Sequence, residues 1–226
     1  MRAGCIFGAY NYLMKKNFFI AFEGIDGSGK STQVKLLKEK LEAAGLKVYT
    51  TCEPTDSPMG KMIRDIFNHR IEADHRTIAA LFVADRLDHL LNKTNGILKM
   101  LEEGYTVITD RYYLSSYAYQ SPYMDLNWVI QANSLSAGLL RPDLNIYIDI
   151  SPEVSIERIN KGRSSIELYE TLDNLKNVRT KYLEIFELLK EEEKILVVDG
   201  NKNPGEIATG IWNKVSSRFL ETSDNS

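Results

Sequence analysis

The sequence of 226 residues predicts an α/β fold in which a five-stranded parallel sheet is flanked by helices. Three observations lead to this prediction. Five short apolar segments barely alternate with polar residues, as is typical of parallel strands covered on both faces. Amphipathic helical stretches separate these segments along the chain. A complete P-loop motif joins the first apolar segment to the first helical stretch.

The expected strands and helices alternate in chain order. The strands are Phe18–Phe22, Lys47–Cys52, Thr106–Thr109, Leu144–Ile150 and Ile195–Val198. Apolar residues at helical spacing predict a first helix from Val34 to Ala44. Further helices are expected over Arg76–Asn92, Ile97–Glu102, Leu126–Ala137, Pro152–Asn160, Ile166–Lys190 and Pro204–Leu220. This alternation predicts one domain over residues 18–220, with ligands at the carboxyl ends of the strands.

Composition excludes some classes of partner. The net charge is −3 and the isoelectric point is about 5.7, so no basic surplus points to nucleic acid or to an anionic membrane. The cysteines, Cys5 and Cys52, lie far apart and do not have metal-site spacing, which favours reduced thiols in a cytoplasmic protein. No apolar segment approaches the length of a membrane span.

The two ends of the chain are expected to lie outside the domain. Residues 1–17 are expected to form an N-terminal extension that is not a targeting signal, because Lys15-Lys16 stands where a cleavage region should be. Met14 could itself be a start, so residues 1–13 are interpreted as a dispensable extension or a misassigned start. Residues 221–226 are expected to fray, and Glu191-Glu192-Glu193 to be a solvated helix end.

The P-loop motif G-x-x-x-x-G-K-[ST] predicts a nucleoside triphosphate site. It comprises Gly24, Ile25, Asp26, Gly27, Ser28, Gly29, Lys30, Ser31 and Thr32. Glycines let successive backbone N–H groups face the phosphates, and the helix N-terminus favours anions. Lys30 is then expected to contact the β- and γ-phosphates, and Ser31 to bind Mg²⁺.

A second motif, Asp110-Arg111-Tyr112, ends the strand Thr106–Thr109. A carboxylate at that place can hold the magnesium ion through its water shell, and the arginine can contact a phosphate oxygen. The alternative is an ordinary surface ion pair.

Three further segments have weaker signals. Phe82 and Arg86 share one helix face and could stack a base and bind its phosphate, although on their own they are better explained as core packing and an ion pair with Asp85 or Asp88. Residues 114–120 supply hydroxyl groups and an amide that suit a pyrimidine edge. The cations of residues 158–166 suit a mobile lid, and a plain basic loop explains them almost equally well.

Taken together, these motifs resemble those of thymidylate kinases. The resemblance rests on residues 22–33, Glu53-Pro54-Thr55, Ala84-Asp85-Arg86, Asp110-Arg111-Tyr112, residues 116–120 and Arg141-Pro142-Asp143-Leu144. It extends from about residue 17 to residue 214 with matching order and spacing. It implies a P-loop nucleoside monophosphate kinase fold with a small lid. It also implies a Mg²⁺-dependent homodimer that transfers the γ-phosphoryl group of ATP to dTMP, giving dTDP and ADP for dTTP biosynthesis.

The resemblance also implies roles for individual residues. The expected dTMP-binding residues are Asp26, Glu53, Arg64, Phe82, Arg86, Arg111, Ser116, Tyr119 and Gln120. Among them, Phe82 would stack on thymine, Gln120 would hydrogen-bond its edge, and the arginines would hold the acceptor phosphate. Asp26 and Glu53 would lie beside the acceptor sugar, and the bond before Pro54 is a candidate cis peptide. Lys30, Arg163, Arg111 and Asp26 are the expected catalytic residues, and Ser31 and Asp110 the expected magnesium ligands.

Two departures from the family pattern affect these assignments. Cys52 stands where the family often has arginine before Glu-Pro. Gly27 occupies the P-loop position at which some members carry the catalytic arginine, so this arginine is expected from the lid, with Arg163 as first choice and Arg158 as second.

Alternatives to this function remain. A deoxynucleoside kinase, or a monophosphate kinase of broader base specificity, would use the same fold and P-loop. A non-catalytic P-loop module would explain the P-loop, but it would leave the presence of Phe82, Arg86, Arg111 and Gln120 as coincidence.

Overall fold

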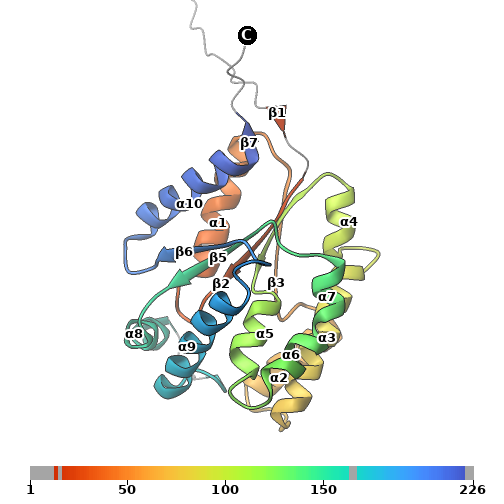
Figure 1. Cartoon of the computed structure of the whole chain (residues 1–226), viewed down its shortest axis with the longest axis vertical. Helices are drawn as coiled ribbons and strands as arrows, with labels where there is room; N and C mark the ends of the chain where they lie inside the picture. Colours follow the sequence, from red (N-terminus) through yellow and green to blue (C-terminus); the bar gives the residue numbers. More distant parts are fainter. Residues whose placement is uncertain (1–12, 15–16, 163–166, 222–226) are drawn as a thin grey trace, which may run out of the picture.

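The computed structural model describes residues 13–14, 17–162 and 167–221 of the chain. Its centre is a parallel sheet of five strands in the order β3-β4-β2-β5-β6 (Figure 1). The strands are β2 (Phe19–Glu23), β3 (Val48–Cys52), β4 (Thr106–Asp110), β5 (Leu144–Asp149) and β6 (Ile195–Asp199). The ends of each strand lie within one residue of those predicted from its apolar pattern. The predicted fold class is therefore confirmed.

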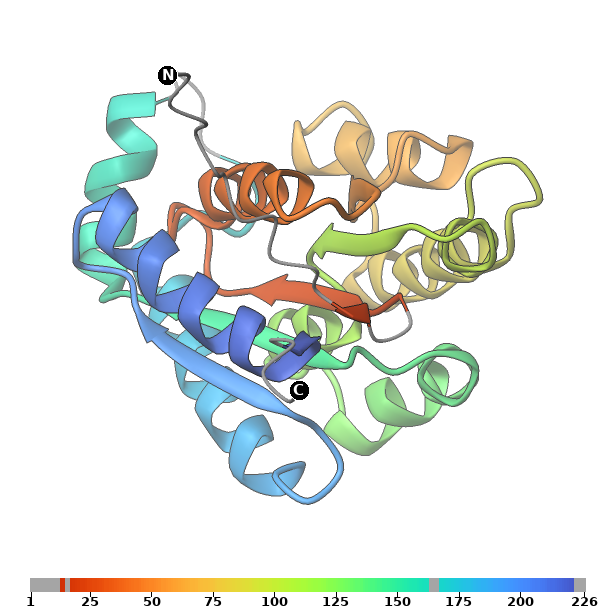
Figure 2. The ribbon, with the colours of Figure 1, turned by 90° about the horizontal axis from the view of Figure 1, so that it is seen from above.

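Helices cover both faces of the sheet (Figures 1 and 2). Phe19 and Ala21 pack on one side into a core with α5 (Tyr113–Gln120) and α9 (Leu172–Leu188). Ile20 and Phe22 pack on the other side into a core with α1 (Lys30–Ala43) and α10 (Pro204–Phe219). Because both faces are covered, every residue of β2 is buried, and its apolar run does not alternate.

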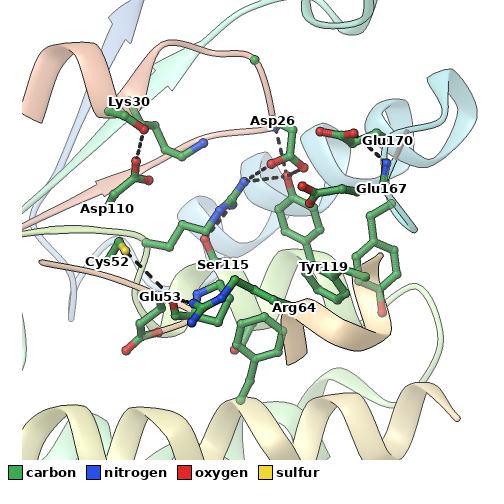
Figure 3. A pocket seen from close by; sticks show the side chains of 18 of the residues that line it. Asp26, Lys30, Cys52, Glu53, Arg64, Asp110, Ser115, Tyr119, Glu167 and Glu170 are labelled. Carbon is green, nitrogen blue, oxygen red and sulfur yellow. Dashed lines mark hydrogen bonds and ion pairs between the residues drawn. The ribbon is translucent and has the colours of Figure 1, made fainter. Parts of the chain in front are cut away.

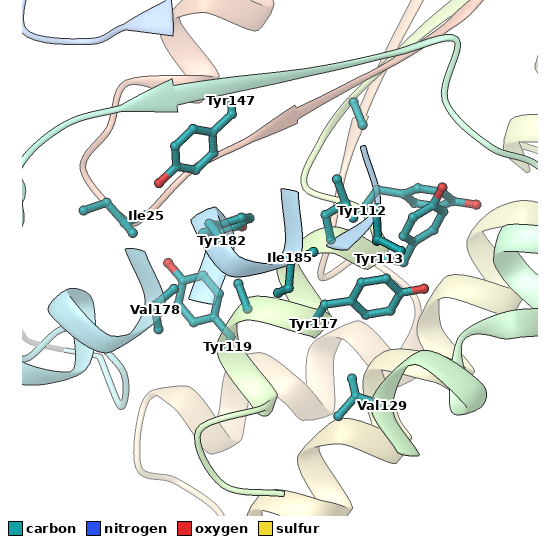
Figure 4. Packing of buried hydrophobic residues seen from close by; sticks show 14 of the residues in the cluster. Ile25, Tyr112, Tyr113, Tyr117, Tyr119, Val129, Tyr147, Val178, Tyr182 and Ile185 are labelled. Atoms are coloured by element: carbon teal, nitrogen blue, oxygen red, sulfur yellow. The ribbon is translucent and has the colours of Figure 1, made fainter. Parts of the chain in front are cut away.

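The first of these cores is rich in tyrosine (Figure 4). The ring of Tyr182 on α9 packs against that of Tyr147 on β5, with 4.9 Å between their centroids. Several of these phenols reach polar partners; the Tyr182 hydroxyl, for example, donates to Glu23 Oε2 at 2.9 Å. Buried tyrosines therefore supply both apolar area and hydrogen bonds to carboxylates at the carboxyl end of β2.

The remaining predicted helices are found with two changes. α3 (His75–Leu91), α4 (Ile97–Glu102) and α8 (Pro152–Gly162) match closely. The single helix expected over residues 126–137 is two, α6 (Leu126–Ala132) and α7 (Ser134–Leu139), which meet at the buried Asn133. The helix expected from Ile166 begins instead at Leu172, because Thr171 caps it by accepting from the backbone N–H of Asn174 at 3.3 Å.

Two helices were not predicted. α2 (Pro58–Phe67) begins with Ser57 as N-cap and Pro58 in its first turn, which is an ordinary helix-start signal. Every residue of α5 is buried, so its sequence has no polar face from which a helical period could be recognised.

The segment Arg141-Pro142-Asp143 lies at the amino end of β5, far from the strand ends that carry the P-loop. Asp143 accepts from the backbone N–H of Phe19 at 2.8 Å, and Arg141 donates to Glu193 at 2.6 Å. Glu193 is buried and also accepts from Tyr113 and Asn145, so the expectation that this residue belongs to a solvated helix end was wrong. The segment Arg141-Pro142-Asp143, one of the motifs that carry the resemblance, therefore stabilises the fold.

The ends of the described chain lie together. β1 (Leu13–Met14) pairs antiparallel with β7 (Leu220–Glu221), so Glu221, expected to fray, belongs to a strand, whereas residues 1–12 and 222–226 lie outside the described residues. That residues 1–13 are dispensable stays a prediction. Within the described part of the chain, no helix is long and apolar enough to cross a membrane.

Candidate active site

The P-loop connects β2 to α1 and surrounds the side chain of Lys30. This side chain is buried, and its Nζ donates to the carbonyl oxygens of Gly24 and Ile25, each at 3.1 Å. Burial and the nearby Arg111 lower the pKa of Lys30 to about 8, although neighbouring carboxylates oppose this change. The side chain of Ile25 lies in the apolar core, so only its backbone faces the loop.

At Gly27 the P-loop touches α8 directly. A Cβ added at Gly27 would lie 2.8 Å from the carbonyl oxygen of Ser155, and the φ angle of this glycine is +70°. The Ser155 hydroxyl also donates to the carbonyl of Asp26 at 2.5 Å. A side chain at position 27 would therefore require α8 to move.

One cavity of about 560 Å³ joins the P-loop to the strand ends and the faces of α2, α3 and α5 (Figure 3). It is lined by Asp26, Gly27, Gly29, Lys30, Ser31, Thr32, Cys52, Glu53, Pro54, Arg64, Phe67, Asn68, Phe82, Arg86, Asp110, Arg111, Ser115, Ser116, Tyr119, Gln120, Glu167, Tyr169 and Glu170. All nine residues expected to bind the acceptor are among them. Of the P-loop, Gly24, Ile25 and Ser28 do not line this cavity.

Ser31 and Asp110 meet at the P-loop end of the cavity. The Ser31 hydroxyl donates to Asp110 Oδ2 at 2.6 Å, which brings a hydroxyl and a carboxylate together at the start of α1. Hard oxygen atoms of this kind are the donors that Mg²⁺ prefers, and Mg²⁺ usually takes only one or two protein ligands beside phosphate and water. The two residues therefore fit Mg²⁺, the metal that the resemblance implies.

Arg111 lines the cavity and contacts both Asp26 and Tyr119. Its NH2 group donates to Asp26 Oδ1 at 2.5 Å and to the Tyr119 hydroxyl at 3.2 Å, and its guanidinium lies 4.8 Å from the Tyr119 ring centroid. Burial opposes the ionisation of Asp26, but Arg111, Lys30 and the Tyr119 hydroxyl outweigh it and lower the pKa of this carboxyl. Arg111 has a φ of 74°, which is uncommon for a residue other than glycine.

Arg86 is buried and paired to Glu53. The Nε and NH2 groups of Arg86 donate to Glu53 Oε2 at 2.9 and 2.5 Å. Asp85, a partner considered for Arg86 on the sequence alone, instead accepts from the backbone N–H of Thr55 at 2.8 Å and from the hydroxyl of Ser57 at 2.7 Å. α3 therefore holds both the cavity arginine and the loop that follows β3.

That loop contains a cis peptide bond between Glu53 and Pro54, as the resemblance implied. Arg64 on α2 donates to the carbonyl oxygens of Pro54 at 2.9 Å and Thr55 at 2.6 Å. The loop lies so close to α2 that a Cβ added at Gly60 would stand 1.9 Å from the Thr55 carbonyl oxygen. Arg64 lines the cavity while also fixing the loop.

Aromatic rings and an amide form the end of the cavity away from Lys30. Phe82 lies 5.9 Å from Phe67 between ring centroids, and Phe67 lies 5.3 Å from Tyr169. Gln120 is buried there, and its Oε1 atom has no hydrogen-bond partner among the described residues. A flat apolar surface beside an unpaired acceptor suits a base that carries a ring N–H donor.

The structure describes only part of the segment 158–166, which was expected to form a lid. Arg158 on α8 donates to the carbonyl of Gly200 at 3.0 Å and lies 3.5 Å from two P-loop carbonyls, outside the cavity lining. Arg163, the first choice for a catalytic arginine, lies outside the described residues.

Some lining residues were missed by sequence reasoning. These are Phe67, Asn68, Glu167, Tyr169 and Glu170. Those after residue 166 were assigned to a continuous helix, whereas the Thr171 cap would have placed them in the loop before α9. Cys52, known only as a departure from the family pattern, lines the cavity, and burial together with Asp110 and Asp56 raises the pKa of its thiol.

The geometry agrees with comparisons between this sequence and known proteins. The sequence profile of the thymidylate kinase family matches residues 22–211. The chain belongs to the thymidylate kinase family. It is 43% identical over 182 residues to a probable thymidylate kinase of Pyrococcus horikoshii, which covers 78% of this chain and 86% of the relative.

Two other relatives give similar matches. A probable thymidylate kinase of Methanocaldococcus jannaschii is 40% identical over 190 residues, covering 84% of this chain and 90% of the relative. The thymidylate kinase of Shouchella clausii is 35% identical over 218 residues, covering 93% of this chain and the whole relative. Like other members of its family, the chain is a phosphotransferase of the nucleoside monophosphate kinase class.

Proposed function

We propose that this thymidylate kinase family member transfers the γ-phosphoryl group of ATP to the 5′-phosphate of dTMP, giving dTDP and ADP for dTTP synthesis in the cytoplasm. One observation carries the proposal. A single cavity has a P-loop lysine at one end and, further along, the buried Arg86, the half-buried Arg111, an aromatic wall and an amide with an unpaired oxygen. A donor triphosphate and an acceptor nucleotide fit such a cavity end to end.

On the donor side, the P-loop backbone and Lys30 would bind the β- and γ-phosphates of ATP. Lys30 now donates to carbonyl oxygens of its own loop and would exchange them for phosphate oxygens. Ser31 and Asp110 would hold Mg²⁺, which supplies charge stabilisation to the donor phosphates when bound.

On the acceptor side, Arg86 and Arg111 would orient the phosphate of dTMP, with Arg64 beside them. The reaction needs no general base, because the second pKa of a phosphate monoester lies near ~6 and its oxygen is largely ionised at pH 7. The barrier is electrostatic, since two anionic groups must meet in line. Cations held in place before the substrates arrive lower that barrier.

The base would lie against Phe82 and present its edge to Gln120. Thymine has an N–H donor beside a carbonyl acceptor, and an amide side chain can satisfy both. The unpaired Oε1 of the buried Gln120 supports this assignment, because a buried acceptor without a partner costs free energy until a donor arrives.

The transition state needs a further cation over the transferring group. Because a side chain at position 27 would clash with α8, we expect the segment after α8 to supply this cation. We propose Arg163 for the role, with Arg158 second because its guanidinium already binds backbone carbonyl oxygens.

We further propose a homodimer. Leu91 at the end of α3 and Leu135 and Leu139 on the adjacent α7 are exposed, which leaves apolar surface that an interface would bury. Size-exclusion chromatography with light scattering tests this: a mass of about twice the 25.7 kDa chain is expected, and a single-chain mass would exclude the dimer.

The experiment that tests the function is ADP release from MgATP with dTMP, dUMP, dCMP, dAMP, dGMP, UMP and thymidine. The expected result is a clear preference for dTMP, which Lys30→Ala abolishes. Similar turnover of several monophosphates would favour a kinase of broad base specificity. Activity on thymidine alone would mean that the arginines do not bind an acceptor phosphate. Nucleotide binding without transfer would favour a non-catalytic module.

A further inference from the structure

The guanidinium of Arg111 is held at both of its ends (Figure 3). At one end, NH2 donates to Asp26 and to the Tyr119 hydroxyl. At the other, NH1 donates to the Ser115 hydroxyl at 3.1 Å and to the carbonyl oxygen of Gly24 at 3.2 Å. Four of its five N–H groups therefore have partners among the described residues, and the remaining group is Nε–H. Because the plane of the guanidinium is fixed, the direction in which Nε–H meets a ligand is fixed as well.

The Ser115 hydroxyl holds Arg111 as an acceptor, because a guanidinium can only donate. Its own proton goes to Glu23 Oε2 at 2.5 Å, and the Tyr182 hydroxyl donates to the same oxygen at 2.9 Å. Ser115 is 7% exposed and Glu23 is fully buried, so the carboxylate meets protein groups in place of water. Glu23 therefore orients the hydroxyl so that its lone pairs face Arg111.

Glu23 also holds the main chain at Arg111. Its Oε1 atom accepts from the backbone N–H of Tyr112, the residue after Arg111, at 3.0 Å. The backbone N–H of Arg111 itself donates to the carbonyl oxygen of Phe22 at 2.8 Å. These two bonds hold the φ of 74°, which a residue with a Cβ adopts when its surroundings fix it. One carboxylate thus holds Arg111 by its main chain and, through Ser115, by its side chain.

We propose that Glu23 is a positioning residue for the phosphoryl acceptor, acting on Arg111 through the hydroxyl of Ser115. The inference rests on the proposed role of Arg111 at the phosphate of dTMP. Without the Ser115 hydroxyl, NH1 would keep only its contact with the Gly24 carbonyl, and the guanidinium would be free to turn about its bond to Asp26. Nε–H would then no longer point in one direction, and the acceptor phosphate would bind less well.

The test compares dTMP with thymidine, which keeps the base and sugar and lacks the phosphate. Dissociation constants are measured by isothermal titration calorimetry, with thymidine in competition, at pH 8. Glu23 is largely ionised there, because burial raises its pKa to about 7. The preference for dTMP, which is the ratio of the two constants, reports the contribution of the phosphate. A general loss of structure weakens both ligands and cancels in the ratio.

Substitutions of Ser115 test the hydroxyl. We expect Ser115→Ala to lower the preference for dTMP about 5-fold or more, while the affinity for thymidine and the KM for MgATP stay within about 2-fold. Ser115→Thr, which keeps the hydroxyl, should keep the preference within about 2-fold of the wild type. An equal loss in Ser115→Ala and Ser115→Thr would overturn the proposal.

Two further variants separate Glu23 from its surroundings. In Glu23→Gln the amide can accept from the N–H of Tyr112 or from Ser115 but not from both, because its NH2 group only donates. The preference for dTMP should therefore fall about 3-fold or more. Tyr182→Phe is the matched control, since it removes the second donor to Oε2 and no hydrogen bond of Arg111. It should lower the thermal unfolding midpoint and leave the preference unchanged, and a loss as large as that of Ser115→Ala would overturn the proposal.

A double-mutant cycle tests the route through Arg111. In the Arg111→Lys background, Ser115→Ala should lower the preference for dTMP no further, because the group through which it acts has already changed. An additive loss would mean that Ser115 acts on the phosphate directly, and would overturn the positioning role. Should Glu23→Gln not fold, the two Ser115 variants, Tyr182→Phe and this cycle carry the same test.

Arg111→Lys also separates this inference from the proposed function. A lowered preference for dTMP in Arg111→Lys with an unchanged preference in Ser115→Ala would overturn the positioning role alone. An unchanged preference in Arg111→Lys would overturn the assignment of Arg111 to the acceptor phosphate, and with it the basis of the inference.

Discussion

Replacing Glu23 by Gln tests the electrostatics beneath the P-loop. This carboxyl is fully buried at the end of β2 and accepts from the backbone N–H of Tyr112 at 3.0 Å, from Ser115 Oγ at 2.5 Å and from the Tyr182 hydroxyl at 2.9 Å. Burial outweighs these bonds and the nearby Arg111, and raises its pKa from 4.5 to about 7. Gln has the shape and charge of the protonated carboxyl, so the variant stays in the neutral form at every pH.

The size and sign of the effect follow from linkage. Between pH 4.5 and 7 the folded state keeps a proton on Glu23 that the unfolded state has lost, so the free energy of unfolding falls as pH rises. A shift from 4.5 to about 7 corresponds to ~3 kcal/mol as an order of magnitude. Relative to the wild type, Glu23→Gln should therefore gain ~3 kcal/mol between pH 4 and pH 8, or ~6–12 °C in the unfolding midpoint.

The assay is urea unfolding of both proteins from pH 4 to pH 8, followed by far-ultraviolet circular dichroism. The difference between the two unfolding free energies is the measured quantity, because contributions of all other titrating groups cancel in it. Only the change of this difference with pH tests the reasoning, because the substitution can also alter the unfolding free energy by the same amount at every pH. A difference that does not change with pH, or that moves in favour of the wild type as pH rises, would refute the reasoning.

Three further predictions concern the site. Gly27→Ala should lose ~1–3 kcal/mol of stability and most of its turnover, because the added methyl group displaces α8. The control is Gly210→Ala, at an exposed helical site with open space, which should gain ~0.5–1 kcal/mol. Urea unfolding and steady-state kinetics of both variants test this prediction. Gln120→Leu should raise KM for dTMP ~10-fold with KM for ATP unchanged, and equal effects on both substrates would contradict base recognition. Arg163→Ala should lower kcat ~10³-fold with little effect on ATP affinity, and near-normal turnover would exclude the lid assignment.

The sheet could be predicted from the sequence because its signal is local. Each strand is a short apolar run, because helices cover both faces of the sheet and neither face of a strand needs polar residues. Helix ends were less certain, because caps such as Thr171 and Ser57 depend on single side chains that also occur in loops. α5 could not be recognised at all, since a helix buried on every side has no period.

The membership of the candidate site was predicted better than its internal contacts. The resemblance to thymidylate kinases implied one acceptor site for Phe82, Arg86 and Gln120, and these three residues line the same cavity. No motif or period in the chain predicts the contact of His89 with Glu53 or that of Asp85 with the loop after β3, because those contacts join segments about 30 residues or more apart. A hydrogen bond of this kind depends on the tertiary fold and leaves no periodic pattern in the chain.

The charges that line the cavity show why those contacts matter. Among the described residues the lining has four cations, Lys30, Arg64, Arg86 and Arg111, and five carboxylates, Asp26, Glu53, Asp110, Glu167 and Glu170. Arg86 and Arg111 are already held by Glu53 and Asp26, so they stay oriented in the low-dielectric interior before any phosphate arrives. That preorganisation leaves the lining without surplus positive charge for two phosphorylated substrates. Under the proposed function, Mg²⁺ and a cation from the segment after α8 would supply the rest, which is why we expect this segment to control turnover more than binding.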